Sequence, residues 1–228
     1  MTITFITGAN KGLGYETARR LIEQGHTVVL GARDSDRGAE AADKLGARFV
    51  QIDVTDDESV AAAVTDVEQH EGLVDVLINN AGVQGRFGTT DVADLREVLE
   101  VNVIGVVRTT EAFLPLLKRS TDPVIVNVSS DMGSLAATHD PARPESKVIF
   151  PAYTASKAAL TMLTTQYAKA MPEIRINAAD PGYTATDFNN HSGPQSVTEG
   201  TDAVVALATE GPGAGSGRYV NRNGSVPF

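Results

Sequence analysis

The sequence predicts a single α/β domain built on a doubly wound, mostly parallel sheet with helices on both faces. Short runs rich in β-branched residues alternate with longer helical patterns along the whole of the 228-residue chain. No linker, charge block or low-complexity segment interrupts this alternation. Such alternation is typical of parallel sheets, because a crossover segment, usually a helix, must carry the chain back between parallel strands. We therefore expect one domain over residues 1–228.

The elements follow from the local pattern. Strands are expected where short apolar runs are bounded by turn residues, and helices where apolar residues recur with the helical period. The expected strands are 2–7, 27–32, 48–54, 74–82, 123–130, 174–182 and 217–221. The expected helices are 13–25, 34–46, 56–72, 91–120, 152–171 and 196–211.

One segment, residues 133–152, breaks the alternation. It contains three prolines and shows no clear period. We expect an ordered inserted loop or a small lid, since long structureless loops are uncommon in compact domains. The alternative is an insertion without a role, which surface loops tolerate well.

Composition limits the classes of partner. The net charge of −10 argues against a nucleic-acid backbone or an anionic membrane as the main partner. The chain has no cysteine, which excludes disulfides and thiolate metal sites, and its histidines show no metal-ligand spacing. The N-terminus does not resemble a signal peptide, and the apolar runs are too short to span a bilayer. We expect a cytoplasmic protein with no metal.

A glycine-rich turn, "TGANKGLG", joins the first expected strand to the first helix. Glycines at positions 8, 12 and 14 allow close approach of the backbone to a ligand. The helix N-terminus offers free N–H groups to a phosphate. This placement favours a dinucleotide pyrophosphate over the alternative, a turn with no ligand.

Tyr153 and Lys157 stand four residues apart in an expected helix, so they project from one face. A free tyrosine has a pKa of about 10, so acid–base work near neutrality needs a drop of about three units. A cation about 4 Å away supplies an interaction of that size. Taken alone, the pair fits core packing better; the surrounding motifs favour an acid.

These motifs together resemble the short-chain dehydrogenase/reductase family. The turn has that family's T-G-x-x-x-G-x-G spacing, and "NNAG", "NVSS", "YTASK" and "DPGYTATD" follow in order, with Asn102 between the first two. The resemblance covers nearly the whole chain and implies a Rossmann-type sheet. The insertion before the tyrosine is similar to that of carbonyl reductases in the family.

The resemblance implies four catalytic residues. Tyr153 would exchange the proton with the substrate oxygen, and Ser130 would donate a hydrogen bond to it. Ser129 is the alternative serine, which we expect to face the sheet. Lys157 would hold the nicotinamide ribose and lower the tyrosine pKa. Asn102 would position a water that relays protons to the lysine, or would only accommodate a kink in its helix.

The resemblance also implies NADP(H) as cofactor. The position after the second strand that favours NAD when acidic is Ala32, followed by Arg33, and Lys11 lies in the glycine turn. Both cations suit a 2′-phosphate, although Asp34 lies beside them and both could be plain surface residues. The implied cofactor contacts are Gly8, Asn10, Lys11, Gly12, Leu13, Gly14, Arg33, Asp53, Val54, Asn79, Ala81, Gly82, Tyr153, Lys157, Pro181, Gly182, Thr184 and Thr186. Asn80 is expected to be structural instead.

The predicted function is NADP(H)-dependent reduction of a ketone or aldehyde to an alcohol by direct hydride transfer. Alcohol oxidation by the same residues is one alternative, and a non-catalytic dinucleotide sensor is another. Met132, Tyr183 and Phe188 are candidate walls for the substrate, and the brief segment 188–195 predicts an open site. Apolar helices on more than one face favour a homodimer or homotetramer, whereas the insertion resembles monomeric relatives.

Overall fold

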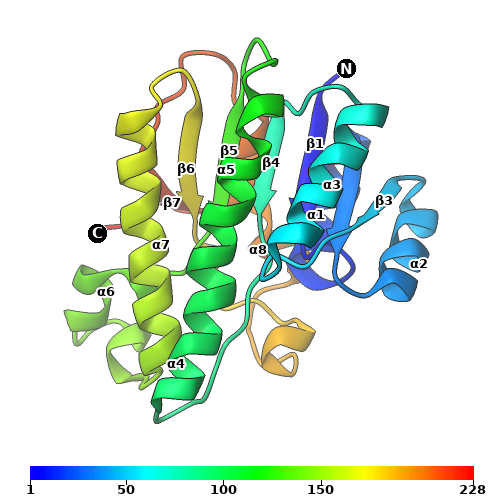
Figure 1. Cartoon of the computed structure of the whole chain (residues 1–228). Helices are drawn as coiled ribbons and strands as arrows, with labels where there is room; N and C mark the ends of the chain where they lie inside the picture. Colours follow the sequence, from blue (N-terminus) through cyan, green and yellow to red (C-terminus); the bar gives the residue numbers. More distant parts are fainter.

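The computed structural model describes residues 1–228 and contains an eight-stranded sheet (Figure 1). The strands are β1 (Ile3–Thr7), β2 (Thr27–Ala32), β3 (Arg48–Gln51), β4 (Val76–Asn79), β5 (Val124–Val128), β6 (Arg175–Ala179), β7 (Tyr219–Asn221) and β8 (Gly224–Ser225). All the expected strands are present, and only the short β8 is additional.

The strand order across the sheet is β3-β2-β1-β4-β5-β6-β7-β8. Neighbouring strands are parallel except β7 and β8, which form an antiparallel pair. The order reverses between β1 and β4, and such a switch point is where open α/β sheets bind ligands. The predicted doubly wound fold is confirmed.

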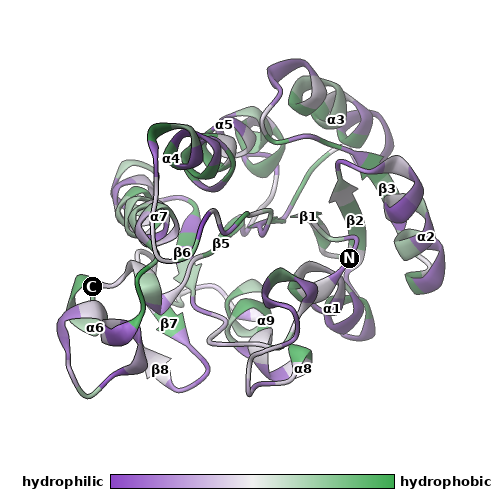
Figure 2. Ribbon diagram, turned by 90° about the horizontal axis from the view of Figure 1, so that it is seen from below, coloured by the Kyte–Doolittle hydropathy of each residue, from purple (hydrophilic) through white to green (hydrophobic).

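Helices cover both faces of the sheet (Figure 2). One face carries α1 (Gly12–Glu23), α2 (Ser35–Leu45) and α9 (Asp202–Thr209), whose alanines, valines and leucines form one apolar core. The other carries α3 (Asp57–His70), α5 (Gly105–Leu117) and α7 (Pro151–Ala170), which form a second core. The remaining short helices are α4 (Val92–Leu99), α6 (Leu135–His139) and α8 (Val197–Gly200). None of the helices has the length and apolar character needed to cross a bilayer.

The single helix expected over residues 91–120 is divided. A π-helical turn, Glu100–Ile104, lies between α4 and α5. The amide of Asn102, inside this turn, donates to the Val83 carbonyl, and its oxygen accepts from the Val83 N–H, both at 2.8 Å. A wide turn of this kind is common at functional sites. Here it brings Asn102 against the loop that follows β4.

The inserted segment has regular structure, and hydrogen bonds near both of its ends attach it to the rest of the protein. It contains α6 and a 3₁₀ turn, Pro144–Lys147. The N–H of Ala136 donates to the carbonyl of Phe228 near the end of the chain. The N–H of Gly88 donates to the carbonyl of Ile149 at 2.8 Å, which joins the insertion to the loop after β4.

We expect Phe113→Ala to destabilise the fold strongly. Phe113 of α5 is fully buried and its ring centroid lies 4.5 Å from that of Phe5 in β1. Removing a buried ring costs about 3–5 kcal/mol because burial is lost and a cavity remains. Urea unfolding would measure the change in free energy, with Met162→Ala, at an exposed position on α7, as the control. An equal, small effect in both variants would contradict this packing.

Candidate active site

The glycine turn follows β1 and packs against the chain that leaves β4. Gly8 has a φ of +65°, and a Cβ at this position would lie 2.9 Å from the Cα of Ala81. A Cβ on Gly14 would lie 2.6 Å from the carbonyl oxygen of Gly8. The turn therefore has no room for side chains at these positions, and its backbone remains accessible to a ligand.

The N-terminus of α1 differs from those of its neighbours. Aspartates cap α2, α3 and α4, and each accepts hydrogen bonds from N–H groups of the first turn. The corresponding residue of α1, Lys11, makes no capping bond, and the first turn of α1 contains no acidic residue. The first N–H groups of a helix have no partner within it, so this end remains available to an anion. The dinucleotide pyrophosphate predicted from the sequence fits this site.

Both asparagine side chains of the "NNAG" stretch form hydrogen bonds with other residues of the protein. The amide of Asn80 donates to the carbonyls of Thr7 at 2.9 Å and Gly8 at 3.0 Å, so its expected structural role is confirmed. The amide of Asn79 donates to Thr110 and Asn127. The Asn79 side chain thus lies buried among the strands and α5, and only the backbone of Ala81 and Gly82 continues along the glycine turn.

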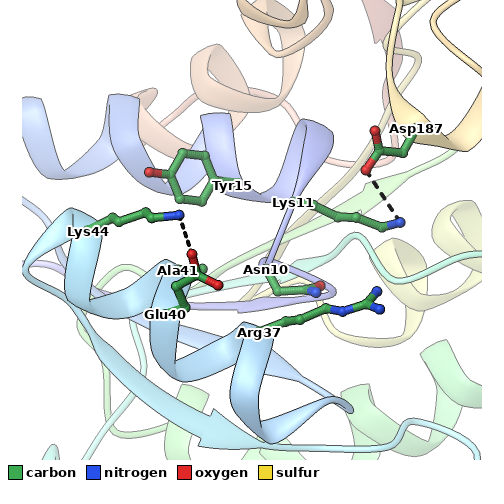
Figure 3. Close-up of a pocket in the computed structure, with 8 residues that line it drawn as sticks. All are labelled: Asn10, Lys11, Tyr15, Arg37, Glu40, Ala41, Lys44 and Asp187. Atoms are coloured by element: carbon green, nitrogen blue, oxygen red, sulfur yellow. Dashed lines mark hydrogen bonds and ion pairs between the residues drawn. The ribbon is translucent and has the colours of Figure 1, made fainter.

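A groove of about 560 Å³ runs beside the glycine turn, between α1 and α2 (Figure 3). Its lining residues are Asn10, Lys11, Tyr15, Arg37, Glu40, Ala41, Lys44 and Asp187. Lys11 lies 3.6 Å from the Asp187 carboxylate, and Arg37 lies 3.3 Å from that of Asp34. Figure 3 shows Lys11 and Arg37 reaching the same end of the groove, past Asn10.

Arg37 is a functional candidate that the sequence reasoning missed, whereas the predicted Arg33 does not line this groove. Arg33 is exposed just after β2, and its carbonyl accepts from the Gln51 amide at 3.1 Å. The sequence could have indicated Arg37 by its position in the first turn of the helix that follows the second strand. The start of this helix lies beside the glycine turn, so a cation there can reach the groove.

Asp53 and Val54 follow β3, where adenine contacts are predicted. One oxygen of the Asp53 carboxylate accepts from the N–H of Thr55 at 3.0 Å and from its hydroxyl at 2.7 Å. Burial raises the pKa of Asp53, but these bonds outweigh it and hold the pKa below its ordinary value. The Val54 carbonyl accepts from Arg108 at 2.6 Å, which fixes the backbone here.

The turn after β6 folds back onto the glycine turn. The Asp180 carboxylate accepts from the N–H of Gly182 at 2.9 Å, and Gly182 has a φ of +67°. The Thr184 hydroxyl donates to the Pro181 carbonyl at 3.0 Å. The side chain of Thr186 would lie 3.7 Å from a Cβ on Gly12. The structure therefore brings the predicted nicotinamide contacts next to the predicted pyrophosphate contacts.

The three predicted catalytic side chains on β5 and α7 come together. Ser130 follows β5, and its side chain lies near enough to Tyr153, in the first turn of α7, to affect the pKa of the tyrosine. The ammonium of Lys157 lies 5.6 Å from the centroid of the Tyr153 ring and donates to the Val128 carbonyl at 2.8 Å. An ammonium has two further protons for other acceptors. Ser129 lies within hydrogen-bond distance of the Thr161 hydroxyl, at 2.8 Å, in the interior, as expected for the alternative serine.

The protonation of the pair differs from the sequence expectation. Burial raises the pKa of Tyr153 above its ordinary value, and nearby Ser130 opposes this only in part. Burial also lowers the pKa of Lys157 to about 8, against the attraction of Asp180. The predicted fall in the tyrosine pKa is therefore absent here, because the loss of hydration is the largest effect on this group.

Asn102 is fully engaged by protein partners. Besides its two bonds to Val83, its amide donates to the Ser156 hydroxyl of α7 at 3.0 Å. Its oxygen would lie 3.3 Å from a Cβ on Gly82, and the Lys157 ammonium would lie 3.8 Å from the same atom. Asn102 therefore fastens the loop after β4 to the catalytic helix, close to the lysine.

Acidic residues lie close to Ser130, and the first of them, Asp131, follows it directly in the sequence. Arg143 of the insertion bonds the carboxylates of Asp131 and Glu145, both at 3.0 Å. Burial and the nearby carboxylates of Asp180 and Glu145 raise the pKa of Asp131 to about 8, and the charge of Arg143 opposes this only in part. The insertion is thus fastened to the residue next to Ser130, and Tyr219 of β7 donates to the Ser130 carbonyl. None of these contacts was predicted.

The fold and this arrangement define a dinucleotide-binding α/β enzyme whose predicted proton-transfer residues lie at the carboxyl edge of the sheet. A family model described as short chain dehydrogenase matches residues 2–196. The chain belongs to this family and is an oxidoreductase that uses a nicotinamide dinucleotide.

Known proteins agree with this assignment. The chain is 32% identical to a (+)-neomenthol dehydrogenase of Capsicum annuum, over 89% of this chain and 90% of that protein. The structure of salutaridine reductase from Papaver somniferum matches with a TM-score of 0.86 and 28% identity, covering 96% of this chain and 99% of that one. An NADPH-bound carbonyl reductase from chicken fatty liver matches over all of both chains, with a TM-score of 0.87 and 27% identity.

The protonation of Asp131 predicts a pH-dependent stability. Folding raises its pKa from an unfolded value of about 3.9, so the folded state binds more protons between that pH and about 8. The contribution of Asp131 to the free energy of unfolding should therefore fall with rising pH, by up to ~1.4 kcal/mol per unit. Asp131→Asn should flatten this slope.

Urea unfolding at pH 5, 6.5 and 8 would measure the slope for the wild type and Asp131→Asn. Asp43→Asn, at an exposed position on α2, is the control and should retain the wild-type slope. Identical slopes in all three proteins would contradict the assignment.

Proposed function

We propose that the chain is an NADP(H)-dependent carbonyl reductase that converts a ketone or aldehyde to an alcohol. The observation that carries this proposal is the convergence of Ser130, Tyr153 and Lys157 beside the glycine turn, with the tyrosine held protonated. A protonated phenol is the form that can donate a proton. An alkoxide is a stronger base than a phenolate, so donation remains favourable even from a tyrosine of raised pKa.

The glycine turn and the N-terminus of α1 would hold the reduced dinucleotide, whose nicotinamide would supply the hydride for the carbonyl carbon. Tyr153 donates its hydroxyl proton to the oxygen that becomes an alkoxide, and Ser130 donates a hydrogen bond to the same oxygen. Lys157, held by the Val128 carbonyl, retains protons for the ribose hydroxyls and places positive charge beside the phenolate that forms. Asn102 holds the loop after β4 in register with α7, and the predicted water relay to Lys157 is part of this proposal.

The preference for NADP(H) is supported by cations around the groove. Lys11 and Arg37 reach one end of it, and Arg33 lies at the end of the adjacent strand. Each of Lys11 and Arg37 has an acidic neighbour that a phosphate could replace. The relative from chicken liver, whose structure contains NADPH, agrees with this preference. The other predicted contacts, from Asp53 and Val54 to Thr184 and Thr186, complete the proposed cofactor site.

Alcohol oxidation would use the same residues with the proton moving the other way. The raised tyrosine pKa favours reduction, because oxidation requires the phenolate. A non-catalytic sensor would not need the assembled serine and tyrosine. The predicted homodimer or homotetramer, the cytoplasmic location and the role of residues 133–152 as a lid are retained as further parts of the proposal.

Tyr153→Phe should bind NADPH almost normally and lose turnover. The ring and its packing remain, but the proton donor is removed, and such donors contribute about 10²–10⁴-fold to rate. Steady-state NADPH oxidation with a panel of carbonyl compounds would measure the loss. Tyr167→Phe, on the same helix near Glu111, is the matched control and should retain activity. Substantial turnover by Tyr153→Phe would refute the role of the tyrosine.

Arg37→Ala should weaken NADPH binding about 10- to 150-fold and leave NADH binding nearly unchanged. A charge-assisted bond to the 2′-phosphate contributes roughly 1.5–3 kcal/mol, and NADH lacks that group. Isothermal titration with both cofactors would measure the difference. Arg19→Ala, whose guanidinium bonds Glu16 and Glu23 outside the groove, is the control. Equal or better use of NADH by the wild type would disprove the preference.

A further inference from the structure

Two phenylalanines flank the Tyr153 ring, and a third packs against one of them. The Phe150 centroid lies 5.3 Å from that of Tyr153 and the Phe188 centroid 6.0 Å from it. Phe87 packs on the far side of Phe150, at 5.6 Å and an interplanar angle of 69°. Phe87 lies in the loop after β4, Phe150 in the insertion and Phe188 in the segment after β6. These segments are far apart in the sequence, and the fold brings them together near Tyr153.

Phe87 and Phe188 are open to solvent, whereas Phe150 is half-buried. Phe87 is 71% exposed, Phe188 42% and the neighbouring Ile149 63%. An exposed apolar group of this kind costs stability if it stays wet, and it typically marks a place where a ligand or partner binds.

Phe87 and Phe150 are held as a unit. The Gly88 N–H donates to the Ile149 carbonyl at 2.8 Å, which fixes the two loops side by side next to the rings. The edge-to-face contact sets the relative orientation of the rings. This aromatic pair, Phe87 and Phe150, forms a second wall beside Tyr153. The sequence expected a site left open by the short segment 188–195 and did not foresee this wall.

We propose that the aromatic pair selects ketones whose carbonyl carries an aromatic ring or a rigid apolar ring. The inference rests on the proposed carbonyl reduction. The ketone oxygen would accept from Tyr153 and Ser130, which leaves its ring beside Phe150 and Phe87. A ring of this size gains apolar burial and edge or stacked contacts there, whereas a small aliphatic ketone cannot reach the rings.

Acetophenone and acetone are suitable probes because both are methyl ketones and differ in the second substituent. The wild type should show a higher kcat/KM for acetophenone, expressed mainly in KM. Phe87→Ala and Phe150→Ala should each raise the KM for acetophenone about three- to tenfold and leave acetone unchanged. Phe150→Leu should recover part of the loss, because it restores apolar area without the aromatic face.

Phe150 precedes α7 and makes no side-chain capping bond, so alanine removes the ring without removing a cap. Leu135→Ala is the matched control, since Leu135 is a 68% exposed apolar residue of the same insertion. It should behave like the wild type with both ketones. A wild type that does not prefer acetophenone, or alanine variants that impair both ketones equally, would overturn the proposal.

Saturation-transfer NMR of acetophenone with the NADP⁺-saturated protein gives a second measurement that does not depend on turnover. Transfer to the phenyl protons should be strong in the wild type and weak in both alanine variants. Failure of every ketone to react with either cofactor would refute the proposed reduction, while this binding result would still decide the role of the aromatic pair. Equal transfer in wild type and variants would count against it.

Discussion

Hydrogen bonds between Thr7 and Asn80 hold the ends of β1 and β4 together. The positions of the other site residues depend on these bonds. The Thr7 hydroxyl accepts from the N–H groups of Asn80 and Ala81, both at 3.0 Å, while the Asn80 amide returns bonds to the Thr7 and Gly8 carbonyls. At a switch point the connections that leave the two neighbouring strands run in opposite directions, so the backbone polar groups just beyond the strand ends lack ladder partners. These side chains satisfy those groups and so keep the glycine turn and its helix in place.

The sheet and most of the site followed from the sequence because they depend on local patterns. The glycine spacing, the strand ends and the pairing of Tyr153 with Lys157 involve residues close together in the chain. Arg37, Tyr219 and the bond between Arg143 and Asp131 did not follow, because they become neighbours only through tertiary packing. The π-helical turn at Asn102 has the same origin, since the bonds to Val83 and Ser156 stabilise it.

Burial explains why the expected fall in the pKa of Tyr153 does not occur. Spacing alone placed a cation beside the tyrosine and so favoured a lowered pKa. The same packing that brings Lys157 near also removes water from both groups, which raises the pKa of the tyrosine and lowers that of the lysine. The effect of desolvation on a pKa therefore has to be considered together with the charge of a partner. The sequence does not show how far a side chain is buried from water.

The bond from Tyr219 to the carbonyl of Ser130 has a consequence for how the protein is made. The two residues are separated by 89 positions, and all four predicted catalytic side chains precede Tyr219 in the chain. During synthesis on the ribosome, a nascent chain that has already produced these four residues still lacks the strand that holds the serine backbone in place. The predicted catalytic centre is therefore completed only after β7 has emerged, and translation products that stop before β7 would lack this contact.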